Sequence, residues 1–183
     1  MCRINPVSDF QIHFCRWFYP TKNIGLELTR QNKVELNALI YLYTMGKFPQ
    51  PAKDFIPQQY PFQFIDDIID CDEEKTICTF RIPENHVMCD EDGLSEQALL
   101  EVMAQTAAAG AGYRAQFLGK GIQKGFIGAI KHIQIHQRPP ARTLIRAEVR
   151  PLHQIGQSSI VQAKTFLGDL EIAYCELTIF IDI

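Results

Sequence analysis

The segment Leu94-Ser-Glu-Gln-Ala-Leu-Leu-Glu-Val-Met-Ala-Gln-Thr-Ala-Ala-Ala-Gly-Ala-Gly-Tyr-Arg114 decides the fold of this 183-residue chain. Ser95 suits an N-cap, Glu96 places negative charge in the first turn, and apolar residues recur at helical spacing. The segment is therefore predicted to be one long helix. Its second half is rich in alanine and glycine, although each glycine costs about 1 kcal/mol relative to alanine in a helix interior. Another part of the chain is expected to pack very close to it.

Glu101 stands in the middle of this predicted helix, and Gln105 follows one turn later on the same face. A glutamate on a helix is most often a solvated residue of the polar face. Here the next charged residue after Glu101 is Arg114, so the helix is predicted to be buried over most of its circumference. Apolar surroundings disfavour the charged form of a carboxylate, which makes Glu101 a candidate general acid.

Length and composition indicate one main domain with an extension, because 46% hydrophobic residues can form one sizeable core. The six cysteines lack the CxxC spacing of zinc and redox sites, so reduced thiols in a cytoplasmic protein are the simplest account. No signal-peptide core or membrane-spanning apolar run is evident, and a soluble cytoplasmic protein is expected. Motifs of phosphate-binding loops, serine hydrolases and zinc proteases are also missing from the sequence.

The charges are distributed unevenly along the chain, although the net charge of -3 argues against a general nucleic-acid binder. Acidic residues dominate between residues 66 and 101, and basic residues dominate between 114 and 150. Neighbouring elements that neutralise one another explain this asymmetry at least as well as a functional surface does. The functional alternative is a basic rim that attracts an acidic carrier protein or an anionic substrate, with four candidate residues: Lys120, Lys124, Arg138 and Arg142.

The remaining chain is expected to form an antiparallel sheet around the helix. Residues 1–55 are predicted to be an N-terminal extension with a short helix between residues 32 and 46, and residues 56–183 the main domain. Periodicity predicts strands over residues 62–69, 76–82, 126–136, 143–150, 158–167 and 170–181. Two strands, one long helix and four strands predict an α+β domain whose sheet is curled around the helix.

Three segments together resemble the hotdog-fold 3-hydroxyacyl-acyl carrier protein dehydratases of the FabA/FabZ type: Ile56-Pro-Gln-Gln-Tyr-Pro-Phe-Gln-Phe-Ile-Asp66, Glu101-Val-Met-Ala-Gln-Thr-Ala107, and residues 126–140. The resemblance covers residues 56–183 and is closer to the dehydratase-like subgroup of aryl polyene clusters. It implies a hotdog fold, with an antiparallel sheet wrapped around a long central helix. It also implies a lyase of fatty acid or polyene-type lipid biosynthesis that dehydrates a 3-hydroxyacyl thioester on acyl carrier protein, with neither a metal nor an organic cofactor.

The same resemblance assigns roles to individual residues. Glu101 corresponds to the catalytic acid, and the N-terminus of the helix is expected to face the thioester carbonyl. Where the family has a Gly-His-Phe-Pro-Gly loop, this chain has Asn85-His-Val-Met-Cys-Asp-Glu-Asp-Gly93, so His86 is the candidate base. Further substrate contacts are expected from Ser95, Gln105 and Phe126.

Two other functions stay open, because one fold supports several reactions. The first is a non-catalytic acyl-carrier or acyl-binding subunit that lacks the base, and the second is an acyl thioesterase. The distinguishing feature is whether His86 reaches Glu101 across a subunit interface. A sheet wrapped on one helix leaves an edge strand unpaired, so a homodimer or higher oligomer joined edge to edge is expected. Acyl carrier protein and its acyl thioester are the other expected partners, and neither nucleic acid nor a membrane is expected.

Overall fold

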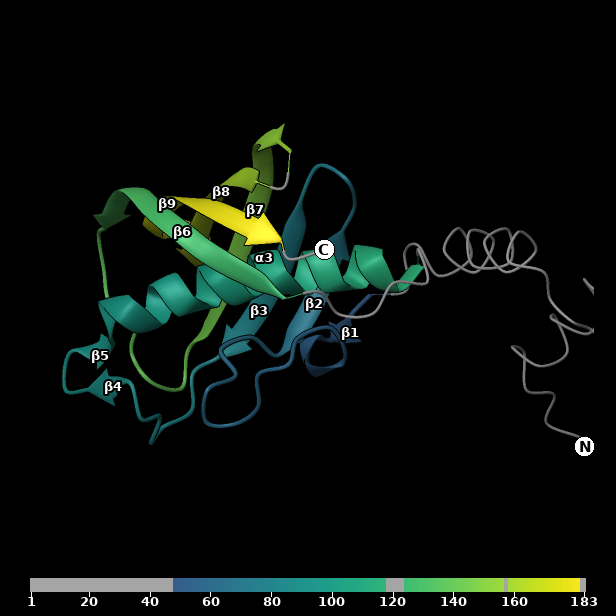
Figure 1. Ribbon diagram of the computed structural model, residues 1–183. Coiled ribbons are helices and arrows are strands. Elements are labelled where there is room, and N and C mark those ends of the chain that lie inside the picture. Colours follow the sequence, from purple (N-terminus) through teal and green to yellow (C-terminus); the bar gives the residue numbers. More distant parts are fainter. Residues whose placement is uncertain (1–47, 118–123, 157, 182–183) are drawn as a thin grey trace, which may run out of the picture. The chain divides into compact units, whose positions relative to one another are not determined.

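The computed structural model describes residues 48–117, 124–156 and 158–181. They form one long helix and an antiparallel sheet that curves around it (Figure 1). The expected short helix between residues 32 and 46 lies outside the described residues, as does Lys120. Among the described helices, none is long and apolar enough to span a membrane.

The long helix is α3 (Glu96–Phe117), close to its predicted bounds. Ser95 is its N-cap, as predicted, because the Ser95 hydroxyl accepts a hydrogen bond of 3.3 Å from the backbone N–H of Ala98. Most side chains of α3 are buried against the sheet and the loop before β2. The helix is therefore the core element around which the domain is built.

The glycine-rich half of α3 has the predicted close neighbours. A Cβ added at Gly112 would lie 2.2 Å from the backbone oxygen of Phe55, and one added at Gly110 would lie 2.0 Å from Oγ1 of Thr76. Both distances are far shorter than a van der Waals contact. Small residues therefore let the segment before β2 and the start of β3 approach the helix backbone.

The main sheet has the strand order β1-β2-β3-β7-β8-β9-β6, and all neighbours pair antiparallel. Six of its strands correspond to the predicted ones: β2 (Asp67–Cys71), β3 (Thr76–Arg81), β6 (Gly125–Ile135), β7 (Leu144–Ile155), β8 (Ser158–Leu167) and β9 (Leu170–Ile181). Within the described residues β6 pairs only with β9, so β6 is an edge strand with one free side.

The residues just before the expected domain start also belong to the fold. β1 (Gln50–Pro51) pairs with β2, and the 3-10 helix η1 (Ala52–Asp54) brings Ala52 and Phe55 into the core. Residues 50–55 thus contribute to the same sheet and core as residues 56–181. The two remaining strands, β4 (Cys89–Asp90) and β5 (Gly93–Leu94), form a small separate hairpin directly before α3.

The prediction of a strand over residues 62–69 is wrong for residues 62–66. Strand pairing begins only at Asp67, because the backbone groups of Phe62 and Phe64 bind the side chain of Gln105 instead of a neighbouring strand. Backbone groups that find a side-chain partner do not need a sheet ladder. This loop consequently lies against α3 at the level of Glu101.

Candidate active site

Glu101 is held in place by Gln105, one turn further along α3. The Gln105 amide donates one hydrogen bond of 2.7 Å to Oε1 of Glu101 and another of 2.7 Å to the Phe62 carbonyl. Its oxygen accepts a hydrogen bond of 2.8 Å from the Phe64 N–H. Gln105 is fully buried and Glu101 is half-buried. These hydrogen bonds fix the orientation of the Glu101 carboxylate. Gln105 was expected to contact the substrate, but its amide group hydrogen-bonds to Glu101, Phe62 and Phe64 instead.

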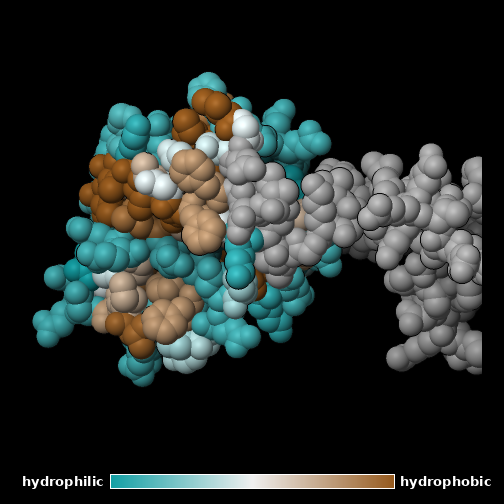
Figure 2. Space-filling view, viewed as in Figure 1, coloured by the Kyte–Doolittle hydropathy of each residue, from teal (hydrophilic) through white to brown (hydrophobic). Residues whose placement is uncertain are grey.

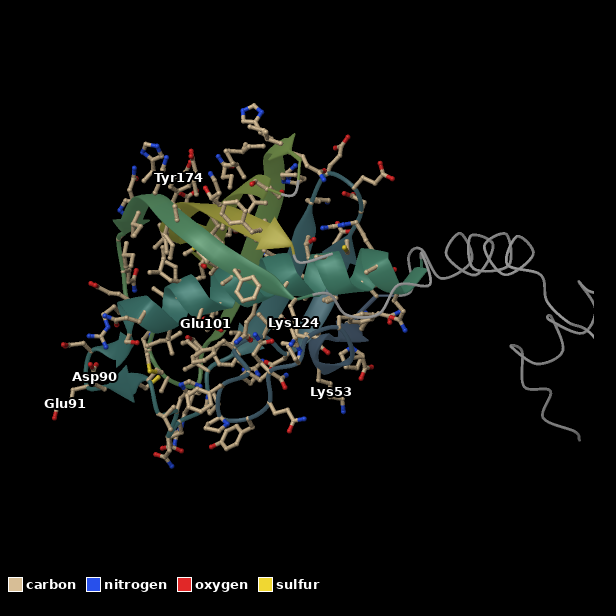
Figure 3. The ribbon with its side chains drawn as sticks, viewed as in Figure 1. Lys53, Asp90, Glu91, Glu101, Lys124 and Tyr174 are labelled. Atoms are coloured by element: carbon tan, nitrogen blue, oxygen red, sulfur yellow. The ribbon has the colours of Figure 1, made fainter. Side chains whose placement is uncertain are left out.

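Glu101 lies on the one face of α3 that the described chain leaves partly uncovered. Figure 3 shows it in the N-terminal third of the helix, above the loops that lead into β2 and β4. The neighbouring residues on this face are apolar and at least partly exposed: Leu100, Ala104, Ala108 and Ala111. An apolar surface beside a half-buried carboxylate suits an acyl chain with a polar reacting end.

His86 is buried on the other side of the loop before β2. Its side chain is 4% exposed, and its ring makes edge contacts with Phe64 and Phe80 at centroid distances of 4.9 and 5.7 Å. Burial lowers the pKa of His86 below its ordinary value, although the Pro61 carbonyl favours the protonated ring. His86 is therefore a neutral imidazole near pH 7.

The hydrogen bond that the His86 ring accepts indicates its tautomer. Nδ1 accepts a hydrogen bond of 3.2 Å from the backbone N–H of Met88, so in the neutral ring the proton belongs on Nε2. Nε2 is buried and makes no hydrogen bond of ordinary geometry to the described residues. A ring with one nitrogen occupied as acceptor and the other protonated has no free lone pair for a substrate proton.

The structure links the two candidate catalytic residues without placing them in hydrogen-bond contact. Phe64 connects them, because its backbone binds Gln105 while its ring contacts His86. No hydrogen bond joins Glu101 to His86 within the described chain. Phe64 and Phe80 were not among the residues expected at the site. Phe64 lies in the first predicted strand and in the first segment of the family resemblance, and Phe80 is one of the alternating apolar residues of the second predicted strand.

Ser95 and Phe126, the other two residues expected to contact the substrate, lie at the start of α3 and on β6. The Ser95 hydroxyl caps α3. Phe126 lies on the edge strand β6 and is 59% exposed. Figure 2 shows apolar surface over the region of β6 and β9. Exposed apolar residues of these two strands are Phe126, Ile127, Ile130, Ile133 and Phe180. A smaller apolar patch covers the loops beneath α3 and contains Tyr60, Phe62 and Val87.

Neither a metal site nor a reactive thiol is evident in the part of the chain that the structure describes. No group of three or more His, Cys, Asp or Glu side chains there is arranged to hold a metal ion. The described cysteines are free, and burial raises the pKa of Cys78 and Cys175 to about 12. These two thiols are therefore protonated at neutral pH and are not nucleophiles.

The lowered pKa of His86 predicts a pH dependence of stability. The unfolded chain binds a proton at His86 near pH 6.5, whereas the folded chain binds it only at lower pH. The free energy of unfolding should therefore fall as the pH drops below about 6.5, with a slope of at most about 1.4 kcal/mol per pH unit for one proton. Replacing His86 with Gln should remove this component, which urea unfolding at pH 7.5 and 5.5 would measure.

The control for this prediction is His153→Gln, because His153 is exposed on β7. That variant should keep the wild-type difference between the two pH values. Equal pH dependence in His86→Gln and the wild type would show that His86 does not titrate differently in the two states.

Solved structures with similar architecture are distant in sequence. The dehydratase heterocomplex ApeI:P from Xenorhabdus doucetiae has a TM-score of 0.67 at 11% identity, over 73% of this chain and 92% of that chain. An HP0420 homologue from Helicobacter felis has a TM-score of 0.54 at 11% identity, over 72% and 98%. A hypothetical thioesterase with coenzyme A from Streptococcus pneumoniae has a TM-score of 0.50 at 11% identity, over 63% and 84%. At such identities the likeness shows the fold alone, and the predicted α+β hotdog fold is confirmed.

The sequence comparison identifies the family. No curated protein matches the chain at a significant level. The model of the ApeP-like family, described as ApeP dehydratase, matches residues 50–180, which is more than half of the chain. The match begins at β1, includes the complete helix with Glu101 and Gln105, and extends to the last strand. The chain therefore belongs to the ApeP-like dehydratase family.

Proposed function

We propose that this protein takes part in the dehydration of a 3-hydroxyacyl thioester carried on acyl carrier protein, in fatty acid or polyene-type lipid biosynthesis. The observation that carries the proposal is the half-buried carboxyl of Glu101, held by Gln105 on the uncovered apolar face of α3. Membership of a dehydratase family supports the reaction type, and the resemblance of the sequence supports the substrate class. The free thiols of the described cysteines suit the expected cytoplasmic location.

The chemistry requires two proton transfers. A base removes the proton from the α-carbon, the carbon–oxygen bond at the β-carbon breaks, and a carbon–carbon double bond forms. Protonated Glu101 gives its proton to the departing hydroxyl, which leaves as water. The resulting carboxylate accepts a charge-assisted hydrogen bond from the Gln105 amide N–H, which stabilises the charge that develops on Glu101.

We infer that the base belongs to a second hotdog subunit. The tautomer of His86 leaves neither ring nitrogen free to take a proton, and the ring is shielded by Phe64 and Phe80. A second copy of the chain would carry His86 in the same arrangement. A different hotdog chain with an accessible base fits the reaction better, and the Xenorhabdus complex in this fold is itself a heterocomplex.

The test is a carrier-linked assay with 3-hydroxyacyl substrates, made on the chain alone and together with a dehydratase-like hotdog chain from the same source. We expect loss of water from the carrier-bound acyl group in the mixture and little or none with either chain alone. Release of a free acid would indicate a thioesterase. Saturable acyl-carrier binding without turnover in the mixture would favour the non-catalytic subunit.

The free side of β6 is the proposed joint between the subunits. An unpaired edge strand that carries exposed apolar residues is stabilised by pairing with another chain. Light scattering should therefore give at least twice the mass of one chain, as a homodimer when the protein is alone or as a heterodimer in the mixture. Replacing Ile133 with Glu should weaken the pairing at least about tenfold, because an apolar contact becomes a buried charge.

The matched control is Leu170→Glu, since Leu170 is similarly exposed but lies at the turn between β8 and β9. This variant should associate like the wild type. A monomeric wild type under both conditions, or equal effects of the two variants, would contradict pairing through β6.

A further inference from the structure

Arg138 contacts both strands of the small hairpin that precedes α3. Its guanidinium donates hydrogen bonds to the carbonyls of Gly93, at 2.8 Å, and Leu94, at 3.1 Å. It also pairs with Asp90, and one nitrogen lies 3.7 Å from a carboxylate oxygen of Asp92. The side chain is only 23% exposed. One side chain thus connects the segment between β6 and β7 to four residues of β4, β5 and their turn.

The backbone next to Arg138 reinforces these contacts. The Pro139 carbonyl accepts a hydrogen bond of 2.9 Å from the Leu94 N–H. Gly93 has φ of +107°, and a Cβ there would lie 2.5 Å from the same Pro139 oxygen. A residue with a side chain is therefore excluded at Gly93 by both its conformation and its surroundings. These contacts restrict the position of the hairpin against this segment.

The hairpin lies between the turn that contains His86 and the start of α3, the helix that carries Glu101. On one side it leads directly into the Ser95 N-cap of α3, and Figure 3 places Asp90 and Glu91 beside that end of the helix. On the other side the Ser95 N–H donates to the Met88 carbonyl, and the Cys89 N–H donates to the His86 carbonyl, both at 2.9 Å. A shift of the hairpin would therefore move the start of α3 and the His86 turn together.

We propose that Arg138 is a positioning residue for dehydration, which holds the hairpin against the segment between β6 and β7 and thereby fixes the start of α3, the helix that carries Glu101. Arg138 itself touches no reacting atom. The proposal rests on the proposed function, because a misplacement of about 1 Å in a catalytic arrangement can cost roughly a hundredfold in rate. It also gives Arg138 a different role from the expected steering of an acidic carrier protein.

Arg142 provides a matched control in the same connecting segment. It carries the same charge, but its side chain is 70% exposed and its ion pair is with Glu84, which is not part of the hairpin. If positive charge alone attracts the carrier, both arginines should contribute to KM, and the contribution should weaken at high salt. If Arg138 positions the site, only its replacement should lower kcat.

The experiment compares Arg138→Gln, Arg138→Lys and Arg142→Gln in the full chain with its partner subunit. We expect kcat of Arg138→Gln to fall about tenfold or more with KM changed less than about twofold, at both low and high salt. Arg138→Lys should recover only part of kcat, because an ammonium cannot reproduce the planar fork of donors. Arg142→Gln should resemble the wild type in both parameters.

Amide hydrogen exchange of residues 88–97 gives a readout that does not depend on turnover. Exchange there should be faster in Arg138→Gln than in the wild type and unchanged in Arg142→Gln. Wild-type exchange and kcat in Arg138→Gln would overturn the proposal, as would a salt-sensitive rise of KM shared by both glutamine variants. If the wild-type complex had no dehydratase activity, the proposed function and the catalytic part of this inference would fail, whereas exchange would still decide whether Arg138 holds the hairpin.

Discussion

Replacing Glu101 with Gln should lower dehydratase turnover by about 10²-fold or more while leaving the fold intact. The amide has nearly the same shape, and its oxygen can still accept the hydrogen bond from Gln105. It has no acidic proton, so the departing hydroxyl loses its general acid. The free energy of unfolding should change by less than about 0.5 kcal/mol. Turnover and the melting temperature would be measured on the same preparation of the complex.

The matched control is Glu96→Gln, because Glu96 is exposed in the first turn of the same helix. It makes the same change from carboxyl to amide but keeps the proposed acid, and turnover should stay within about twofold of the wild type. Wild-type turnover in Glu101→Gln would eliminate the catalytic assignment. A large loss of stability would instead indicate that Glu101 is a structural carboxyl.

The fold was predictable because its elements are long and regular. α3 has an N-cap, an apolar pattern and twenty-two residues, and all of these are visible in the sequence. The long strands alternate apolar and polar residues, which indicates both their presence and their inward face. The alanine and glycine content of the helix even predicted a close approach, which the contacts of Gly110 and Gly112 confirm.

Short elements could not be predicted because contacts distant in the sequence determine them. β4 and β5 have two residues each, and Arg138 and Pro139, more than 40 positions later, hold them together. The loop before β2 has the composition of a strand, but Gln105 binds the backbone groups that a strand would use. Local propensity cannot reveal such partners.

The candidate site shows the same limit. Helical spacing predicted that Glu101 and Gln105 share a face, and the two side chains are hydrogen-bonded. It also suggested His86, but neither its burial between two aromatic rings nor the N–H that Met88 donates to it can be read from spacing. The charge asymmetry was equally ambiguous. In the structure Arg138 and Arg142 pair with acidic residues of the preceding segment, which supports mutual neutralisation for these two residues.

Replacing Gly112 with Ala should destabilise the protein, although alanine is the better helix former. The added methyl group would lie 2.2 Å from the Phe55 oxygen and 3.1 Å from the Phe55 carbonyl carbon, and these backbone atoms cannot rotate away. Helix propensity contributes a gain of about 1 kcal/mol, whereas overpacking in a core costs about 1–3 kcal/mol and occasionally more. Because the contact is with backbone, the cost should be at the upper end of this range. We expect a net loss of about 2 kcal/mol, measured by urea unfolding.

Ala108 offers the control for this last substitution, since it lies one turn earlier on α3 and is exposed. Ala108→Val adds more volume than Gly112→Ala, but the added methyl groups lie on the uncovered face of α3. The loss in free energy of unfolding should therefore come only from the lower helix propensity of valine and stay under about 1 kcal/mol. The melting temperature of Gly112→Ala should then fall by roughly 4–8 °C, and that of Ala108→Val by clearly less. A Gly112→Ala variant more stable than the wild type would mean that the segment ending at Phe55 is not packed on α3. The packing of this segment on α3, on which the position of the Gln105–Glu101 pair depends, would then be contradicted as well.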